Sequence, residues 1–235
     1  MKEYAILLDT TNCTGCNTCM YKCTQENRLQ EPPSRGLFRT WVEINDRGLV
    51  HHRCLHCLDP ACVAACKESL GENSALTRSG YGPVLYDAAL CQGCGACVES
   101  CPFEVPRLDE AAEKIVKCSM CAHRLAAGKP PACVEACPTN ALIFGEYKQI
   151  LSRAQKTAAE QRLHLYGQRE NGGGHFLVLT REIPEAAGYP RVAFRAEKLD
   201  PVPAGVGVAA VAAAALSGLK AFSDRRARIE KETKP

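Results

Sequence analysis

The chain has 235 residues, 16 of them cysteine, and a formal net charge of +3 at pH 7 with histidine neutral. Cysteines grouped as C-x-x-C in a chain of this length indicate bound metal and do not fit the disulfide framework of a small secreted domain. The basic residues form no stripe interleaved with aromatic side chains, so no nucleic-acid partner is expected. Because only 6% of the residues are aromatic, bound metal is expected to supply much of the folding free energy.

The N-terminal segment predicts a short strand at Tyr4 to Leu8 that leads directly into a first cysteine run. No secretory signal peptide is expected, because the start lacks a long apolar stretch and a small-residue cleavage site. The run has the spacing C-x2-C-x2-C-x3-C and consists of Cys13, Cys16, Cys19 and Cys23. This spacing is typical of [4Fe–4S] clusters, and the last cysteine of such a run ligates a second cluster. A partner run is therefore required.

An insertion at residues 24–53 separates the first run from the second. Within it, residues 38–44 alternate between apolar and polar side chains as in a strand, which is expected to continue past a turn at 46–48. The second run adds two residues before its third ligand and consists of Cys54, Cys57, Cys62 and Cys66. A second insertion, at residues 67–90, ends in a predicted strand at 82–87.

The third run repeats the spacing of the first and is followed by a proline. Gly93 and Gly95 within it are expected to let the backbone bend close to a cluster. The third run consists of Cys91, Cys94, Cys97 and Cys101, and the fourth of Cys118, Cys121, Cys133 and Cys137. Spacing alone leaves the pairing of the runs open. If the second and third form one ferredoxin-like unit, the first and fourth close around it as the other, and all 16 cysteines are used.

The segment after a last predicted strand at 141–145 has a different character. Helical periodicity predicts a helix over 146–166, and a strand at 175–180 and an irregular segment at 181–200 follow. Residues 201–219 carry no charge and are long enough to span a bilayer as a helix, with a buried or partner-packed helix or a linker as alternatives. Basic residues follow this stretch, so the C-terminus is expected in the cytoplasm and the cluster domain across the membrane.

The order and spacing of the four cysteine runs, with the apolar stretch after them, resemble the iron–sulfur (beta) subunit of membrane-bound formate dehydrogenases. More broadly they resemble the four-cluster subunits of molybdopterin oxidoreductases and some nickel–iron hydrogenases. The resemblance covers nearly the whole chain, and residues 117–124 match the family form Lys-Cys-x-x-Cys-x-x-Arg. It implies an α+β fold of two nested ferredoxin-like units holding four [4Fe–4S] clusters, followed by a C-terminal extension and one transmembrane helix. The expected domains are 1–145 for the clusters, 146–200 for the extension, 201–222 for the transmembrane helix and 223–235 for a basic cytoplasmic tail.

The family's ligation, carried over residue by residue, implies four sites. Site I would consist of Cys13, Cys16, Cys19 and Cys137, and site II of Cys23, Cys118, Cys121 and Cys133. Site III would consist of Cys54, Cys57, Cys62 and Cys101, and site IV of Cys66, Cys91, Cys94 and Cys97. Lys67 stands where many relatives have proline, which leaves ligation intact but adds a positive charge beside site IV.

The resemblance also implies a chain that transfers electrons and has no catalytic residue, because each site already carries four thiolates. Electrons would pass one at a time through the four clusters. They would move between a molybdopterin catalytic subunit containing molybdenum or tungsten, with formate as the leading substrate, and a membrane cytochrome b-type subunit serving the quinone pool. The C-terminal helix would contact membrane lipid, and the cluster domain would be periplasmic, exported with a signal-bearing partner.

Several alternatives stay open at this level. The complex could be a nickel–iron hydrogenase or another molybdopterin oxidoreductase, and a soluble polyferredoxin is a further reading, although it would need no apolar tail. Zinc sites usually pair one C-x-x-C with another across a loop, which fits these runs poorly. His56 and His123 are expected to donate hydrogen bonds or lie at the surface and not to be ligands, and Trp41 is expected to pack. Lys117 either tunes two clusters or is solvated.

Overall fold

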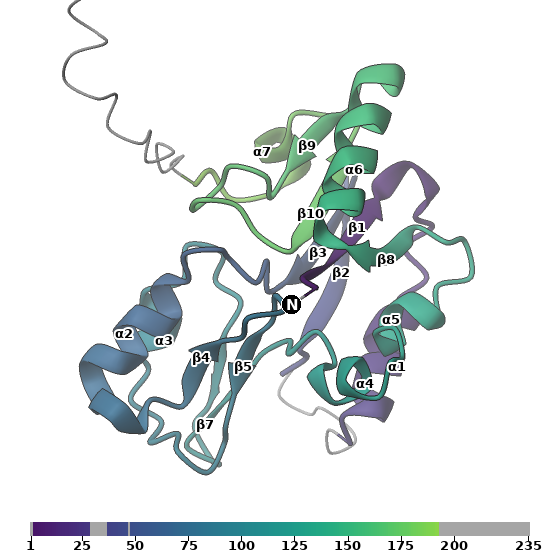
Figure 1. Cartoon of the computed structure of the whole chain (residues 1–235). Helices are drawn as coiled ribbons and strands as arrows, with labels where there is room; N and C mark the ends of the chain where they lie inside the picture. Colours follow the sequence, from purple (N-terminus) through teal and green to yellow (C-terminus); the bar gives the residue numbers. More distant parts are fainter. Residues whose placement is uncertain (1, 29–36, 47, 193–235) are drawn as a thin grey trace, which may run out of the picture. The chain divides into compact units, whose positions relative to one another are not determined.

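A four-stranded sheet brings the N-terminal strand beside strands from the far end of the described chain (Figure 1). Its order is β8 (Leu142–Glu146), β1 (Tyr4–Asp9), β10 (Phe176–Thr180) and β9 (His164–Tyr166). β1 runs parallel to β10 and antiparallel to β8, and β9 runs antiparallel to β10. The strands predicted near the N-terminus, at 141–145 and at 175–180 are thus confirmed.

Alternation along β1 divides its side chains between two hydrophobic cores. Ala5 and Leu7 face α6 (Tyr147–Gln161), together with residues of β10 and the buried Ile150. Ile6 and Leu8 belong to a second core that contains cysteines. A strand buried on both faces is a near-continuous apolar run, as β1 is in the sequence.

The helix after the clusters is shorter than the sequence pattern predicts. It ends at Gln161, because Arg162 adopts a left-handed conformation with φ of 56°. The three residues of β9 then pair with β10. The predicted helix at 146–166 was therefore correct in type and wrong at its C-terminal end, where strand pairing overrides the helical spacing.

Three hairpins complete the β structure of the described residues. β2 (Thr40–Asn45) pairs with β3 (Gly48–Arg53), which confirms the strand predicted at 38–44 and its continuation past the turn. The remaining hairpins are β4 (Leu76–Arg78) with β5 (Val84–Tyr86), and β6 (Arg107–Asp109) with β7 (Lys114–Val116). β5 lies within the strand predicted at 82–87.

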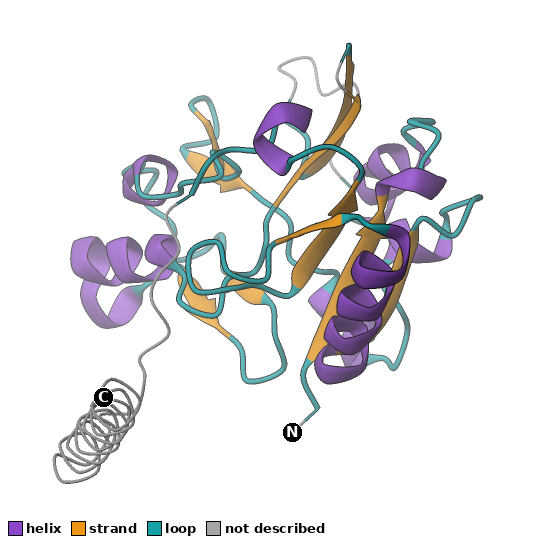
Figure 2. Cartoon of the chain, turned by 90° about the horizontal axis from the view of Figure 1, so that it is seen from above, coloured by secondary structure: helices purple, strands orange, loops and turns teal. Residues whose placement is uncertain are grey.

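The shorter helices other than α7 carry or flank the cysteine runs, and the helices lie mostly around the strands (Figure 2). α2 packs against α3, and α1 packs against α5. Their bounds are α1 Thr18–Glu26, α2 Ala61–Leu70, α3 Ala96–Glu99, α4 Ala122–Ala126, α5 Ala132–Glu135 and α7 Pro184–Ala187, with 3-10 turns at Thr10–Asn12 and Gly71–Asn73. α7 lies in the segment predicted to be irregular.

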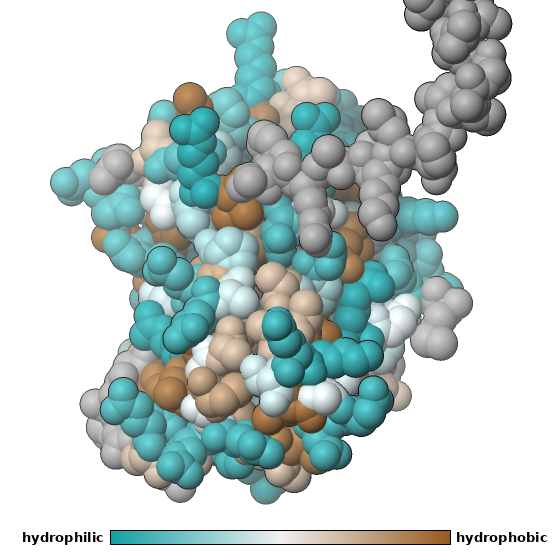
Figure 3. All heavy atoms as spheres, turned by 90° about the vertical axis from the view of Figure 1, so that its left-hand side faces the viewer, coloured by the Kyte–Doolittle hydropathy of each residue, from teal (hydrophilic) through white to brown (hydrophobic). Residues whose placement is uncertain are grey.

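The cysteines are part of the apolar interior. One core between α2, β4, β5 and β7 contains Cys62, Cys66 and Cys97, whereas the core under α6 contains no cysteine among its described members. On the face that carries α2, hydrophobic patches are small and separated by hydrophilic side chains (Figure 3). In this part of the protein the buried core includes three cysteine side chains.

The computed structural model describes residues 2–28, 37–46 and 48–192. These lie in one compact unit that spans residues 1–195, with the mixed helices and strands expected of an α+β, ferredoxin-like cluster domain. Within the described ranges, no helix combines the length and apolar character needed to cross a bilayer. The segments predicted as a transmembrane helix, 201–222, and as a basic tail, 223–235, lie outside the described residues.

Candidate metal centres

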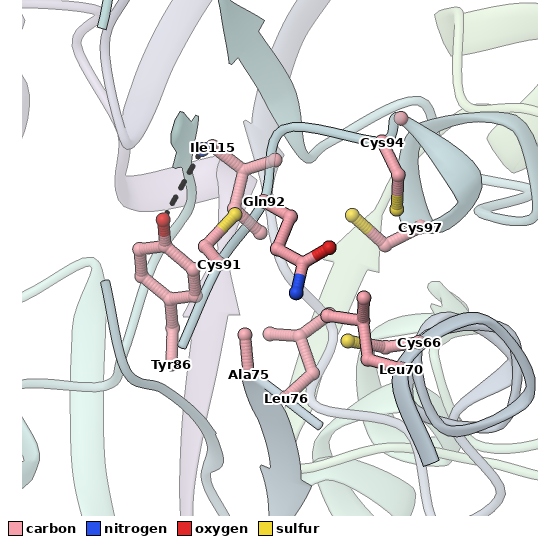
Figure 4. A pocket seen from close by; sticks show the side chains of 11 residues that line it. Cys66, Leu70, Ala75, Leu76, Tyr86, Cys91, Gln92, Cys94, Cys97 and Ile115 are labelled. Atoms are coloured by element: carbon pink, nitrogen blue, oxygen red, sulfur yellow. Dashed lines mark hydrogen bonds between the residues drawn. The ribbon is translucent and has the colours of Figure 1, made fainter. Parts of the chain in front are cut away.

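Three cavities are each lined by four cysteines, and these are the sets expected for sites I, III and IV. The remaining lining is mainly apolar, with Leu8 and Leu142 at site I and Phe103 at site III. At site IV the four sulfur atoms point into a common space bordered by Leu76 and Ile115 (Figure 4). Four thiols around an enclosed apolar space are a donor set suited to an iron–sulfur cluster.

The four cysteines of site II are all buried. Cys23 lies on α1 and Cys133 on α5, and these two helices are in contact. Burial raises the pKa of the Cys23 thiol, and the neighbouring Cys118 and Cys133, followed by Cys121, raise it further. The structure therefore brings the second expected set together as well.

All four runs share one backbone feature. The residue two positions after the first cysteine has a positive φ in every run. These residues are Gly15 (69°), His56 (50°), Gly93 (69°) and Met120 (52°). The sequence analysis singled out Gly93, whereas His56 and Met120 carry no glycine signal.

This left-handed conformation turns a backbone N–H toward the first sulfur of the run. The N–H groups of His56 and Met120 donate to that sulfur at N···S distances of 3.4 and 3.3 Å. Those of Gly15 and Gly93 form the corresponding backbone hydrogen bonds. Hydrogen bonds to the sulfur stabilise the thiolate form that a cluster requires.

Two helices connect neighbouring sites. On α1, Cys19 of site I precedes Cys23 of site II by one turn, and on α2, Cys62 of site III precedes Cys66 of site IV. Residues four apart on a helix are neighbours on its surface. Cys118 of site II also lies near enough to site III to affect the pKa of a cysteine there. The four sets therefore follow one another in the order I, II, III, IV.

Burial differs along this order. Cys16 of site I and Cys94 of site IV are exposed, whereas the cysteines of site II are all buried. In site III only Cys101 is partly exposed. The two ends of the series thus reach the surface, and its middle is covered by protein.

Burial keeps several of these thiols protonated in the absence of metal. It raises the pKa of Cys19, Cys54, Cys97 and Cys121 to about 11 and that of Cys57 to about 12. Metal binding to these positions must therefore release protons.

Two cations are fully buried beside the cysteines. Lys117 is 2% exposed, and its Nζ donates to the carbonyl oxygens of Val84 and Cys118, each at 2.7 Å. It is not solvated. Arg53, also 2% exposed, was not singled out from the sequence. The signal that could have found it is its position directly before Cys54, at the start of the second run.

The expectation for the two histidines holds for His123, which is exposed, and not for His56, which is buried and accepts a hydrogen bond. The Nδ1 atom of His56 accepts from the backbone N–H of Val84 at 3.0 Å, and His123 pairs with Glu26 at 2.9 Å. Sequence analysis missed His51, whose Nε2 lies 3.4 Å from the sulfur of Cys13. Burial, followed by the charge of Arg53, lowers the pKa of His51 to about 3, so its ring is neutral at physiological pH.

Trp41 packs as predicted. Its ring stacks on His52 at a centroid distance of 4.6 Å, and the guanidinium of Arg107 lies 4.0 Å from its ring centre.

Comparison with known proteins agrees with this donor set. The 4Fe-4S dicluster domain family matches residues 47–147, which contain the second, third and fourth runs. A protein of Nitratidesulfovibrio vulgaris is 34% identical over 98% of this chain and 69% of its own length. The formate dehydrogenase iron-sulfur subunit of Haemophilus influenzae is 31% identical over 80% of this chain and 67% of its own length. The hydrogenase-2 operon protein HybA of Escherichia coli O157:H7 is 29% identical over 80% of this chain and 73% of its own length.

Proposed function

The chain belongs to the family of iron–sulfur electron-transfer subunits related to those of formate dehydrogenases and HybA, and we propose that it carries four [4Fe–4S] clusters for a formate-oxidising complex. The resemblance inferred from the cysteine runs is thereby confirmed. The ligands proposed for the clusters are the four cysteine sets of sites I to IV.

The observation that carries this proposal is the grouping of cysteines from distant runs. Cys137 lines the cavity of the first run, and Cys101 lines the cavity of the second. Cys66 lines the cavity of the third run, and Cys23 lies near cysteines of the fourth. Each run therefore lends its last cysteine to another run's site, as in two-cluster ferredoxins. The shared N–H···S geometry of the runs supports the same ligation.

When bound, such clusters supply one-electron oxidation and reduction. The protein's own part is to hold them in series and to control their exposure. Cys19 and Cys23 lie one helical turn apart on α1, and Cys62 and Cys66 lie one turn apart on α2. Each helix therefore holds ligands of two neighbouring sites close together. The apolar walls keep water from the inner sites, while Cys16 and Cys94 leave the outer sites accessible to partners.

We further propose a molybdenum- or tungsten-containing catalytic subunit at one end of the series and a membrane cytochrome b-type subunit at the other. The apolar stretch at 201–219 and the basic residues after it support a membrane-spanning helix in contact with lipid, with the C-terminus cytoplasmic and the clusters periplasmic.

Purification of the complex from native membranes tests this function. We expect about 16 iron atoms and as many sulfides per chain, with molybdenum or tungsten, a large catalytic chain and a small cytochrome. Protease added to spheroplasts should digest the cluster domain and spare the C-terminal tail. A chain recovered alone from the soluble fraction would contradict the membrane complex and leave a soluble polyferredoxin.

A hydrogenase is the second candidate, because HybA resembles this chain over a similar share of its length. Nickel in place of molybdenum or tungsten in the purified complex would establish it. The proposed role of the chain, an electron-transfer subunit, is the same in both cases.

A further inference from the structure

Arg53 is a buried cation with unused hydrogen-bond donors. Its Nε donates to the hydroxyl of Thr40 at 3.1 Å, and its guanidinium lies 4.7 Å above the ring of Phe176. Its two terminal nitrogens, Nη1 and Nη2, are buried and reach no partner at normal hydrogen-bond distance among the described residues. A buried charge in this condition is strongly unfavourable unless an anion compensates it.

The groups around this guanidinium are cysteines of two different sites. The guanidinium lies over Phe176, which belongs to the same buried core as Cys19 of site I and Cys118 and Cys133 of site II. Burial alone would lower the pKa of Arg53, and the charges of these three cysteines raise it. Arg53 in turn lowers the pKa of Cys19 and Cys23 against the larger effect of burial. The guanidinium thus lies at the junction of sites I and II.

Lys117 provides a comparison within the same chain. It is equally buried, but its ammonium group already donates to two carbonyl oxygens. Arg53 differs because its unused donors remain available beside the cysteine sulfurs. An arginine also keeps its charge in any buried site and presents several donors in one plane.

We propose that Arg53 is a positioning residue that donates N–H bonds to the clusters at sites I and II and holds a positive charge between them. This inference rests on the proposed function, since it requires clusters at both sites. Reduction adds negative charge to a cluster, so a fixed cation and N–H···S bonds stabilise the reduced form and raise the reduction potential. Arg53 would therefore make the clusters at this junction easier to reduce.

The test is a redox titration of the purified complex, followed by electron paramagnetic resonance, with Arg53→Met, Arg53→Gln and Arg53→Lys. At the wild-type midpoint potential, we expect the reduced-to-oxidised ratio of two of the clusters to fall by about tenfold or more in Arg53→Met and Arg53→Gln. Arg53→Lys should restore part of the shift, because it keeps the charge. The exposed Arg153→Met on α6 is the control, and it should change no potential.

Unchanged potentials in iron-loaded Arg53→Met or Arg53→Gln would overturn the proposal. If neither variant binds iron, the wild-type complex with isotope-labelled arginine decides instead. Coupling between an arginine nitrogen and a reduced cluster is expected, and its absence would also overturn the proposal. A wild-type complex without iron and sulfide would instead overturn the proposed function, which keeps the two failures distinguishable.

Discussion

At the scale of single residues, the cysteine runs depend on a backbone conformation that favours glycine. Gly93 and Gly95 both have positive φ, at 69° and 78°. They differ in the space around them. A Cβ on Gly93 would lie 2.8 Å from the carbonyl oxygen of Glu113, whereas one on Gly95 would meet nothing within 4 Å.

We therefore predict that Gly93→Ala is more destabilising than Gly95→Ala. Left-handed strain should cost about 1–2 kcal/mol in both variants, and displacing the Glu113 backbone should add about 1–3 kcal/mol in Gly93→Ala. The measurement is the urea concentration that halves the visible absorbance of the iron-loaded protein. Equal midpoints for the two variants would show that the contact with Glu113 relaxes without cost.

The cysteine runs are visible in the sequence, and the family resemblance implies how they group, but the residues around them are harder to predict. The glycine in the third run pointed to its bend, but His56 and Met120 adopt the same conformation without any sequence signal. Arg53 was missed for a related reason. Its position before Cys54 is the one local signal, whereas its role depends on cysteines that are distant in sequence.

At the scale of elements, the local periodicity predicted most strands, but the partners of those strands did not follow from it. β10 lies beside β1 although more than 160 residues separate them along the chain. The end of α6 was misplaced because β9 gains hydrogen bonds in the sheet that the helical pattern does not reveal. Strand pairing in the folded sheet therefore determines the end of α6 and the partner of each strand, which the local sequence does not specify.

The packing of α6 on the sheet gives a prediction for this element. Ile150 is 4% exposed in the core beneath the helix, so Ile150→Ala should lower the free energy of unfolding by about 2–5 kcal/mol. Iron content should not change, because this core contains no cysteine among its described members. The measurement is denaturant unfolding followed by circular dichroism, with iron analysis of the same sample.

Gln155→Ala is the matched control, because Gln155 is exposed on the same helix. It should change stability by less than about 0.5 kcal/mol. Loss of iron in Ile150→Ala would mean that the sheet and the cysteine sites form one cooperative unit. It would contradict the prediction that the core under α6 is energetically separate from the cysteine sites.

At the scale of the whole described unit, the metal is expected to contribute unevenly to stability. The core between α2, β4, β5 and β7 has three cysteines among its buried residues, and the cavity of site IV lies within it. One face of the four-stranded sheet packs against the core that contains cysteines, and the other face packs against the core under α6. Removing iron would leave the cysteines of the first region around a largely apolar space without the metal that joins them, whereas the sheet would keep one intact face.

Hydrogen exchange of the iron-free chain tests this difference. After chelation under reducing conditions, amides of β4 and β5 should exchange at least about tenfold faster than in the loaded protein, since structural metal supplies folding free energy where its ligands pack. Amides of β1 and β10 should keep more of their protection, because α6 still covers them. Uniform loss of protection would contradict this prediction, and it would mean that the clusters hold the entire unit together, including the core that contains none of their ligands.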